Sequence, residues 1–112
     1  MADMTEILKI EREADALREA KKFQEAVDKL KTLLELDEDF VRAHLALAIL
    51  YSELGDAETS VKHGEKAVQL EPEDPFNRTA LSITYQKAFE LTRDPNYIQL
   101  AETAKERSHM AR

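Results

Sequence analysis

Histidine, cysteine and serine often carry metal binding or nucleophilic catalysis, and this sequence offers few useful arrangements of them. The three histidines, His44, His63 and His109, are never four residues apart, and no His–Glu–x–x–His segment occurs. A zinc site on one helix is therefore not expected. Cysteine is absent, which excludes a thiol nucleophile and disulfide bonds. No serine has a matched histidine and acid nearby. These patterns predict no metal, no cofactor and no enzymatic activity.

The histidines are instead expected to have structural or solvated positions. His44 falls at a position that faces a partner helix, so we expect it to be at least half-buried. We expect His63 and His109 to face solvent.

Acidic side chains outnumber basic ones, and their positions indicate structural roles. The 112 residues include 16 Lys and Arg against 23 Asp and Glu, a net charge of −7. This balance disfavours binding to nucleic acid or to anionic membrane surfaces. Acidic pairs such as Glu35 with Asp39 and Glu71 with Asp74 flank turns. Carboxylates commonly cap helices at such turns, so general acid–base catalysis is not expected.

Two further absences bear on location. No segment approaches the roughly 20 apolar residues of a membrane span, and the first residues lack the basic and apolar regions of a secretory signal. We therefore expect one soluble cytoplasmic domain over residues 1–112, without membrane insertion.

Segment 41–74 has the pattern of two helices that fold back on each other. An apolar stripe with helical spacing begins at Leu47. Gly55 can adopt the left-handed conformation that ends a helix. Asp56 can cap the next helix, and Pro72 ends it because proline lacks an N–H group.

This unit recurs at intervals of 34 residues. The expected frames are about 7–40, 41–74 and 75–110. The third frame is irregular, because its alignment beyond Ala88 needs about six extra residues before Tyr97. The sequence predicts an all-α fold, an α-α superhelix or solenoid of three antiparallel helical hairpins with six helices.

Several helix bounds can be predicted. The first helix is expected over 5–21, the second over 23–36 and the sixth over 95–110. The fifth begins at Pro75 and should be about one turn longer than its counterparts.

The repeating pattern resembles that of tetratricopeptide-repeat proteins over nearly the whole chain. The middle repeat matches the family pattern at Leu47, Ala48, Tyr51, Gly55, Asp56, Ala67 and Pro72, and the first repeat at Ala14, Phe23 and Ala26. The chain departs from the pattern at Glu13, Lys21, His44, Ser60 and Gly64. At Gly64 the family usually has a bulky residue.

The resemblance implies that the first helix of each pair lines the inner, concave side of a curved array, where partner proteins bind. The groove positions of the family correspond here to nine candidate partner-binding residues: Leu8, Glu11, Asp15, Arg42, Leu45, Ile49, Phe76, Thr79 and Ile83. Relatives that clamp a C-terminal carboxylate use Lys and Asn in this groove. The corresponding positions here hold Glu11, Asp15, Ala46 and Ala80, so binding of that type is not expected.

The apolar residues independently indicate a surface that needs a partner. Leu45 and Ile49 lie off the stripe that contains Leu47, so this helix is apolar nearly all round and should be buried on two sides. Together with Phe76 and Ile83 they would form one open apolar patch, which usually marks an interaction site. Alternatively, neighbouring helices of the same chain cover these side chains.

We therefore expect a protein-protein interaction module or scaffold that binds an amphipathic helix or an apolar peptide in a concave groove. The partner should present an apolar face, with basic groups near the acidic first repeat. The alternative is a self-assembling structural unit that buries the same patch in a homodimer or a longer homo-oligomer.

Overall fold

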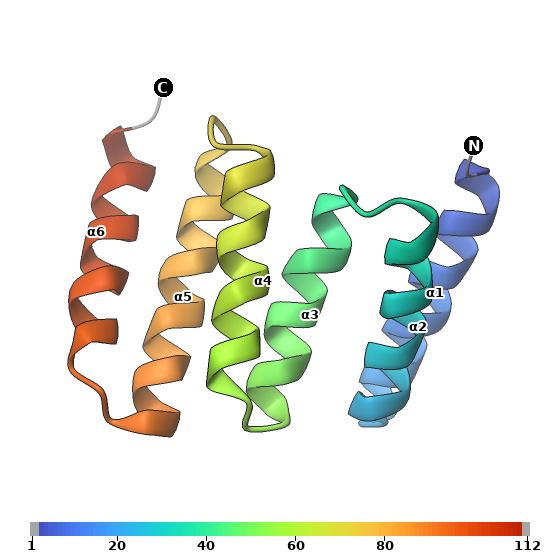
Figure 1. Cartoon of the computed structure of the whole chain (residues 1–112), viewed down its shortest axis with the longest axis horizontal. Coiled ribbons are helices and arrows are strands. Elements are labelled where there is room, and N and C mark those ends of the chain that lie inside the picture. The colour runs from blue at the N-terminus through green and yellow to red at the C-terminus, as the bar shows by residue number, and fades with distance from the viewer. Residues whose placement is uncertain (1–2, 111–112) are drawn as a thin grey trace.

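The computed structural model describes residues 3–110, and the side chains of residues 3–107. Throughout this part of the chain, α-helices are joined by short turns and no strand occurs. The helices are α1 (Met4–Glu19), α2 (Phe23–Leu36), α3 (Val41–Glu53), α4 (Ala57–Leu70), α5 (Pro75–Thr92) and α6 (Asn96–Met110). They form a row with the two termini at opposite ends (Figure 1), which confirms the predicted all-α solenoid of helical hairpins.

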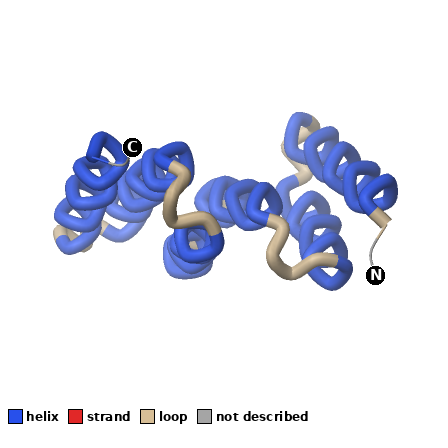
Figure 2. Tube along the Cα trace, turned by 90° about the horizontal axis from the view of Figure 1, so that it is seen from above, coloured by secondary structure: helices blue, strands red, loops and turns tan. Residues whose placement is uncertain are grey.

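Each helix packs mainly on its neighbours in the sequence. The closest pairs are α1 with α2, α3 with α4, and α5 with α6, and these hairpins are joined through α2–α3 and α4–α5 contacts. Seen from above, the helices form a bent row and not a closed bundle (Figure 2). Helix α3 also contacts α5 directly, and this contact forms the floor of the groove described below.

The turns within the hairpins depend on residues with positive φ angles. Lys21 (φ 62°), Gly55 (φ 84°) and Arg93 (φ 64°) all adopt the left-handed conformation. Lys21 and Gly55 are 34 residues apart, whereas Arg93 follows Gly55 by 38 residues, one helical turn more. Accordingly, α5 has 18 residues, more than one turn longer than α3 with 13 but only two residues longer than α1 with 16. Helix α1 ends at Glu19, earlier than predicted, because the left-handed turn begins there.

Aspartates cap α4 and α5, as their positions predicted. The Asp56 carboxylate accepts the Thr59 N–H at 3.1 Å, and the Asp74 carboxylate accepts the Phe76 N–H at 2.9 Å. The hydrogen bonds from Thr59 lower the pKa of Asp56.

The buried side chains form two clusters that divide between α3 and α4. The first cluster joins α1, α2 and α3, with Leu30, Leu33 and Leu47 among its fully buried members. The second joins α4, α5 and α6 around Leu81 and Tyr85. At the α3–α4 contact the Ser60 hydroxyl donates to the Ala48 carbonyl at 2.6 Å.

Some large apolar residues lie at the surface. Leu54 is exposed at the end of α3, and Ile98 and Leu100 are 47% and 42% exposed on α6. Among the described residues no helix packs on the far side of α6, so only Ala101 and Ala104 of its apolar stripe are buried.

Candidate protein-binding groove

The α3–α5 contact brings five of the nine predicted site residues together around an apolar hollow. The helical spacing of four along α3 aligns Leu45 with Ile49, and a spacing of seven along α5 aligns Phe76 with Ile83. The hollow has a volume of about 240 Å³. It is lined by Leu45, Ala48, Ile49, Phe76, Thr79, Ala80, Ile83 and Thr84.

The helices of this chain do not cover the hollow. Ile49 is 49% exposed, Phe76 66% and Ile83 51%, while Leu45 is half-buried. The expectation that neighbouring helices hide these side chains is therefore wrong for the three exposed residues. Fully burying such side chains stabilises a complex by on the order of 1.5–3 kcal/mol each. The hollow can consequently bind an apolar surface, and it has little polar chemistry of its own.

The other four predicted residues lie outside this hollow. The Arg42 guanidinium donates two hydrogen bonds to the Glu11 carboxylate, at 2.8 and 3.0 Å, across the α1–α3 side of the row. This bonding raises the pKa of Arg42, and the nearby charge of Asp15 adds to the effect. Arg42 also lies over the Phe40 ring, at 4.8 Å from its centroid. Leu8 is half-buried on α1. In the N-terminal half of the predicted groove, Glu11 and Arg42 are therefore paired with each other.

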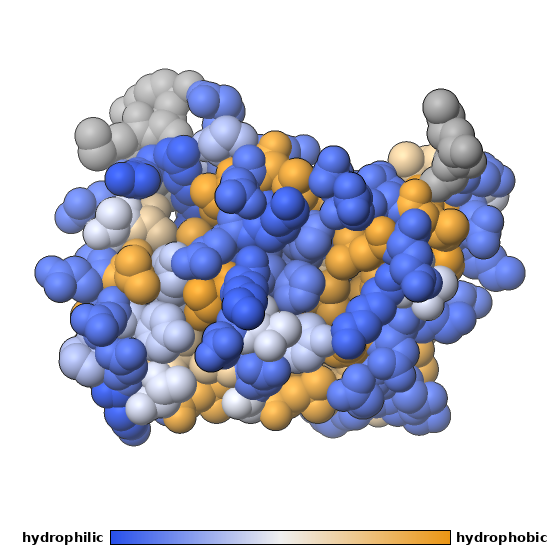
Figure 3. All heavy atoms as spheres, viewed as in Figure 1, coloured by the Kyte–Doolittle hydropathy of each residue, from blue (hydrophilic) through white to orange (hydrophobic). Residues whose placement is uncertain are grey.

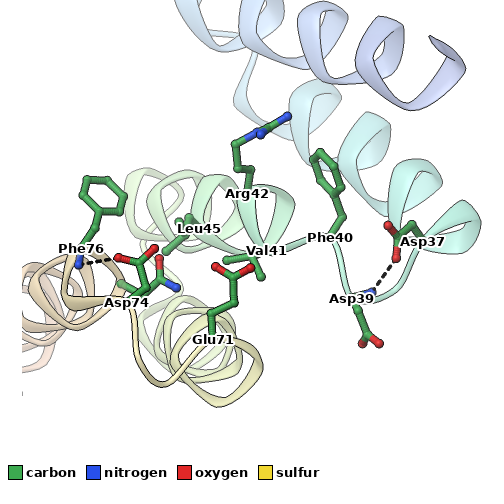
Figure 4. A pocket seen from close by; sticks show the side chains of 10 residues that line it. Asp37, Asp39, Phe40, Val41, Arg42, Leu45, Glu71, Asp74 and Phe76 are labelled. Carbon is green, nitrogen blue, oxygen red and sulfur yellow. Dashed lines mark hydrogen bonds between the residues drawn. The ribbon is translucent and has the colours of Figure 1, made fainter. Parts of the chain in front are cut away.

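A second hollow, which the sequence did not reveal, adjoins the apolar one. It lies between the α2–α3 turn and the α4–α5 turn and has a volume of about 420 Å³ (Figure 4). It shares Leu45 and Phe76 with the apolar hollow. The full lining is Asp37, Asp39, Phe40, Val41, Arg42, Leu45, Glu71, Asp74, Phe76 and Asn77.

The acidic groups of this second hollow were predicted only as turn residues. Asp74 does cap α5, and the Asp37 carboxylate accepts the Asp39 N–H at 3.1 Å. However, Asp37 and Glu71 are 34 residues apart, so both turns present carboxylates along the same edge of the row. This periodicity was the available signal for the acidic hollow. Asn77, which is buried at its wall, had no signal in the sequence.

The histidines form a structural pair. His44 is buried as expected, but His63, which was predicted to face solvent, is half-buried and stacks on the Tyr51 ring at a centroid distance of 5.8 Å. The His44 Nε2–H donates to the Glu38 carbonyl (2.8 Å), so the His63 Nδ1–H donates to His44 Nδ1 (3.0 Å). Burial, followed by proximity to His44 and Lys31, lowers the pKa of His63 to about 4.

These residues do not create a metal site. Across the side chains that the structure describes, no three His, Asp or Glu residues are grouped as metal ligands. The side chain of His109 lies outside the described residues. Within residues 3–110 no helix has both the length and the apolar character needed to cross a membrane.

The fold and the groove together define a helical-repeat protein with a surface open on one side. The sequence matches two family models, "TPR repeat" over residues 14–55 and "Tetratricopeptide repeat" over residues 41–74. The chain belongs to the tetratricopeptide-repeat family. A search of curated protein sequences gives no match.

Solved structures with the same fold cover nearly the whole chain. The first TPR of Spaghetti (RPAP3), bound to the HSP90 peptide SRMEEVD, aligns with a TM-score of 0.68 at 16% identity, covering 97% of this chain and 95% of that one. PcrH from Pseudomonas aeruginosa gives 0.66 at 15%, covering 99% and 95%. The Yersinia enterocolitica chaperone SycD, in complex with a peptide of the translocator YopD, gives 0.63 at 14%, covering 99% and 94%. At these identities the similarity establishes the fold.

Proposed function

We propose that this protein is an interaction module that binds an apolar or amphipathic segment of another protein, most simply a helix, in the groove between α3 and α5. The observation that carries the proposal is the apolar hollow with Ile49, Phe76 and Ile83 exposed around it. An amphipathic helix presents residues at i, i+3, i+4 and i+7 to such a groove. The peptide complexes of Spaghetti and SycD support the use of this fold for binding protein segments.

The alternative function is self-assembly, and one observation favours it. The terminal hairpin exposes three further large apolar side chains, those of Leu91, Ile98 and Leu100. A second copy of the chain could bury the groove patch of Leu45, Ile49, Phe76 and Ile83, which would give a homo-oligomer. Light scattering at several protein concentrations separates the two functions, because groove binding to another protein predicts a mass that does not change with concentration.

The direct test of groove binding uses two isoleucines of nearly equal exposure. Helical peptides are selected on the wild-type protein from a displayed random library, and the affinity of the selected peptide is measured for Ile49→Glu and Ile98→Glu. Ile49 is 49% exposed in the groove, and Ile98 is 47% exposed on α6. We expect Ile49→Glu to weaken binding by about 100-fold or more, because it removes apolar burial and places an unpaired charge in the contact.

Ile98→Glu should leave the affinity within about twofold, and circular dichroism should be unchanged in both variants. Equal binding by Ile49→Glu and the wild type would contradict the proposal. A mass that rises with concentration and falls back to the monomer in Ile49→Glu would favour self-assembly instead.

A further inference from the structure

The acidic hollow beside the apolar one contains charges that this chain leaves unpaired. Asp37, Asp39, Glu71 and Asp74 line it, and none of them forms an ion pair among the side chains of residues 3–107. The cation at its edge, Arg42, is bonded to Glu11 and stacked over Phe40. In Figure 4 the Arg42 side chain points away from Glu71 and Asp74. The hollow therefore has carboxylates available for an external cation.

A second observation, independent of charge, indicates a ligand in the same hollow. Asn77 lines it and is only 1% exposed, and its side-chain Nδ2 is buried without a hydrogen-bond partner. An unpaired buried donor costs free energy, and such groups are rare in native structures. The residue 34 positions earlier, Ala43, has no polar side chain. Asn77 is thus a departure from the repeat, and its N–H group requires an acceptor.

The carboxylates and the Asn77 N–H together indicate which chemical groups would bind in the acidic hollow. Carboxylates recognise the ammonium or guanidinium group of Lys or Arg, and the Asn77 N–H recognises a carbonyl oxygen. The last turn of an α-helix offers both, because its final carbonyls lack partners within the helix and basic side chains are favoured there. The first turn of a helix offers free N–H groups instead, which the carboxylates could accept but which would leave the Asn77 Nδ2–H without an acceptor.

The position of the acidic hollow determines in which direction a bound helix would run along the groove. It adjoins the apolar hollow through Leu45 and Phe76 at the N-terminal ends of α3 and α5. Ile83 lies seven residues beyond Phe76, about 10 Å along α5. A bound helix of three turns would therefore reach both hollows.

We propose that, given the proposed groove binding, the partner helix lies antiparallel to α3 and α5 with its C-terminal turn in the acidic hollow. One Lys or Arg of that turn pairs with the Glu71 carboxylate, the Asp39 carboxylate at the rim adds to the negative potential there, and a main-chain carbonyl accepts the Asn77 Nδ2–H. The apolar residues of the earlier turns contact Ile49 and Ile83.

The experiment begins with the library selection on the whole chain. We expect selected peptides to share an apolar stripe followed, on its C-terminal side, by Lys or Arg. An apolar stripe without that basic residue, or with it on the N-terminal side, would overturn this inference and leave groove binding intact. Peptides without an apolar stripe would overturn both.

The selected peptide, labelled with a fluorophore, is then titrated against charge variants at low and high salt. The double variant Asp39→Asn with Glu71→Gln should bind about tenfold more weakly at low salt, and the loss should shrink as salt screens the pair. The control, Glu102→Gln with Glu106→Gln on α6, removes the same charge from a distant exposed surface and should change binding less than twofold. An equal loss in both double variants would overturn the specific ion pair.

Asn77→Ala tests the contact between the Asn77 N–H and the carbonyl of the partner. Alanine already occupies the equivalent position of the second repeat, at Ala43. The variant should bind the peptide about fivefold to tenfold more weakly. Its melting temperature should be at least that of the wild type, because the unpaired donor is gone. Unchanged affinity would overturn the contact.

Discussion

The two seams between hairpins are built differently, although equivalent positions form them. Leu30 on α2 and Gly64 on α4 are 34 residues apart. Leu30 is buried and fills the first seam. At Gly64, an added Cβ would lie 3.1 Å from Leu81 Cδ1 and 3.4 Å from Thr84 Cγ2, so α5 approaches α4 closely. Figure 1 shows α4 beside α5, while α2 and α3 share fewer contacts. The absence of one side chain therefore sets the spacing of the second seam.

The groove side differs between the seams as well. Glu11 and Arg42 close the first seam with a charged pair. At the second seam, the equivalents of Glu11 and Asp15 are Leu45 and Ile49, which face α5 and leave an apolar hollow. In the space-filling view, which presents the face seen in Figure 1, polar side chains cover much of the surface and apolar ones appear in separate patches (Figure 3). One repeating scaffold thus carries two kinds of groove surface, and only the second is open to an apolar partner.

Truncating the side chain that fills the first seam should have the largest effect. Leu30→Ala removes a side chain that is 2% exposed and leaves a cavity between α1, α2 and α3. We expect the free energy of unfolding to fall by about 2–5 kcal/mol in urea titrations. The control is Leu36→Ala on the same helix, which is 37% exposed and should cost less than about 1 kcal/mol. Equal costs for the two variants would show that the first seam does not depend on Leu30.

Placing leucine at Gly64, the equivalent position in the second seam, should lower the free energy of unfolding by less than Leu30→Ala does. Gly64→Leu places a large group where α5 leaves no room, and overpacking should lower stability by about 1–3 kcal/mol. Gly64→Ala should stay within about 1 kcal/mol of the wild type, because the helix preference of Ala offsets a contact that the end of Leu81 can relieve. Urea unfolding measures both. A Leu variant as stable as the wild type would mean that the α4–α5 distance is not set by Gly64.

Acidification should weaken the hairpin that lies between the seams. Burial of His63 near His44 and Lys31 lowers its pKa from 6.5 to about 4. Between these values the unfolded chain binds a proton at His63 that the folded chain does not, so stability falls as the pH falls. We expect a loss of about 1–2 kcal/mol from pH 7 to pH 4 at this residue. His63→Gln should show a smaller decline over the same range. Parallel pH profiles for the two proteins would exclude His63 as the cause.

Much of the fold follows from local signals. Gly55, Asp56 and Pro72 mark the middle hairpin, and the 34-residue recurrence extends that pattern in both directions. The two extra apolar residues on α3, Leu45 and Ile49, identified the side of the helix that forms the groove. These features depend on the chain within one or two hairpins, where helical spacing and turn chemistry are informative.

The site was less predictable because it depends on how hairpins are placed against each other. The positions of Asn77 and Glu71 in one hollow require the angle between the second and third hairpins, which Gly64 and Leu81 set by close packing. Periodicity in the sequence does not encode this angle. His63 was misplaced for a different reason, because its ring stacks on His44 and Tyr51 of the neighbouring helix α3.

The smallest effect should come from the charged pair that distinguishes the first seam on the groove side. The Arg42 and Glu11 side chains are 61% and 21% exposed, so water screens much of their attraction. A double-mutant cycle with Arg42→Gln and Glu11→Gln should give a coupling of about 0.2–1 kcal/mol that decreases in high salt. The more exposed Glu58–Lys62 pair on α4, at 3.8 Å, should give a coupling closer to zero. A salt-independent coupling above about 2 kcal/mol would mean that this pair stabilises the packing of α1 on α3. Groove residues would then contribute to the stability of the first seam as well as the second.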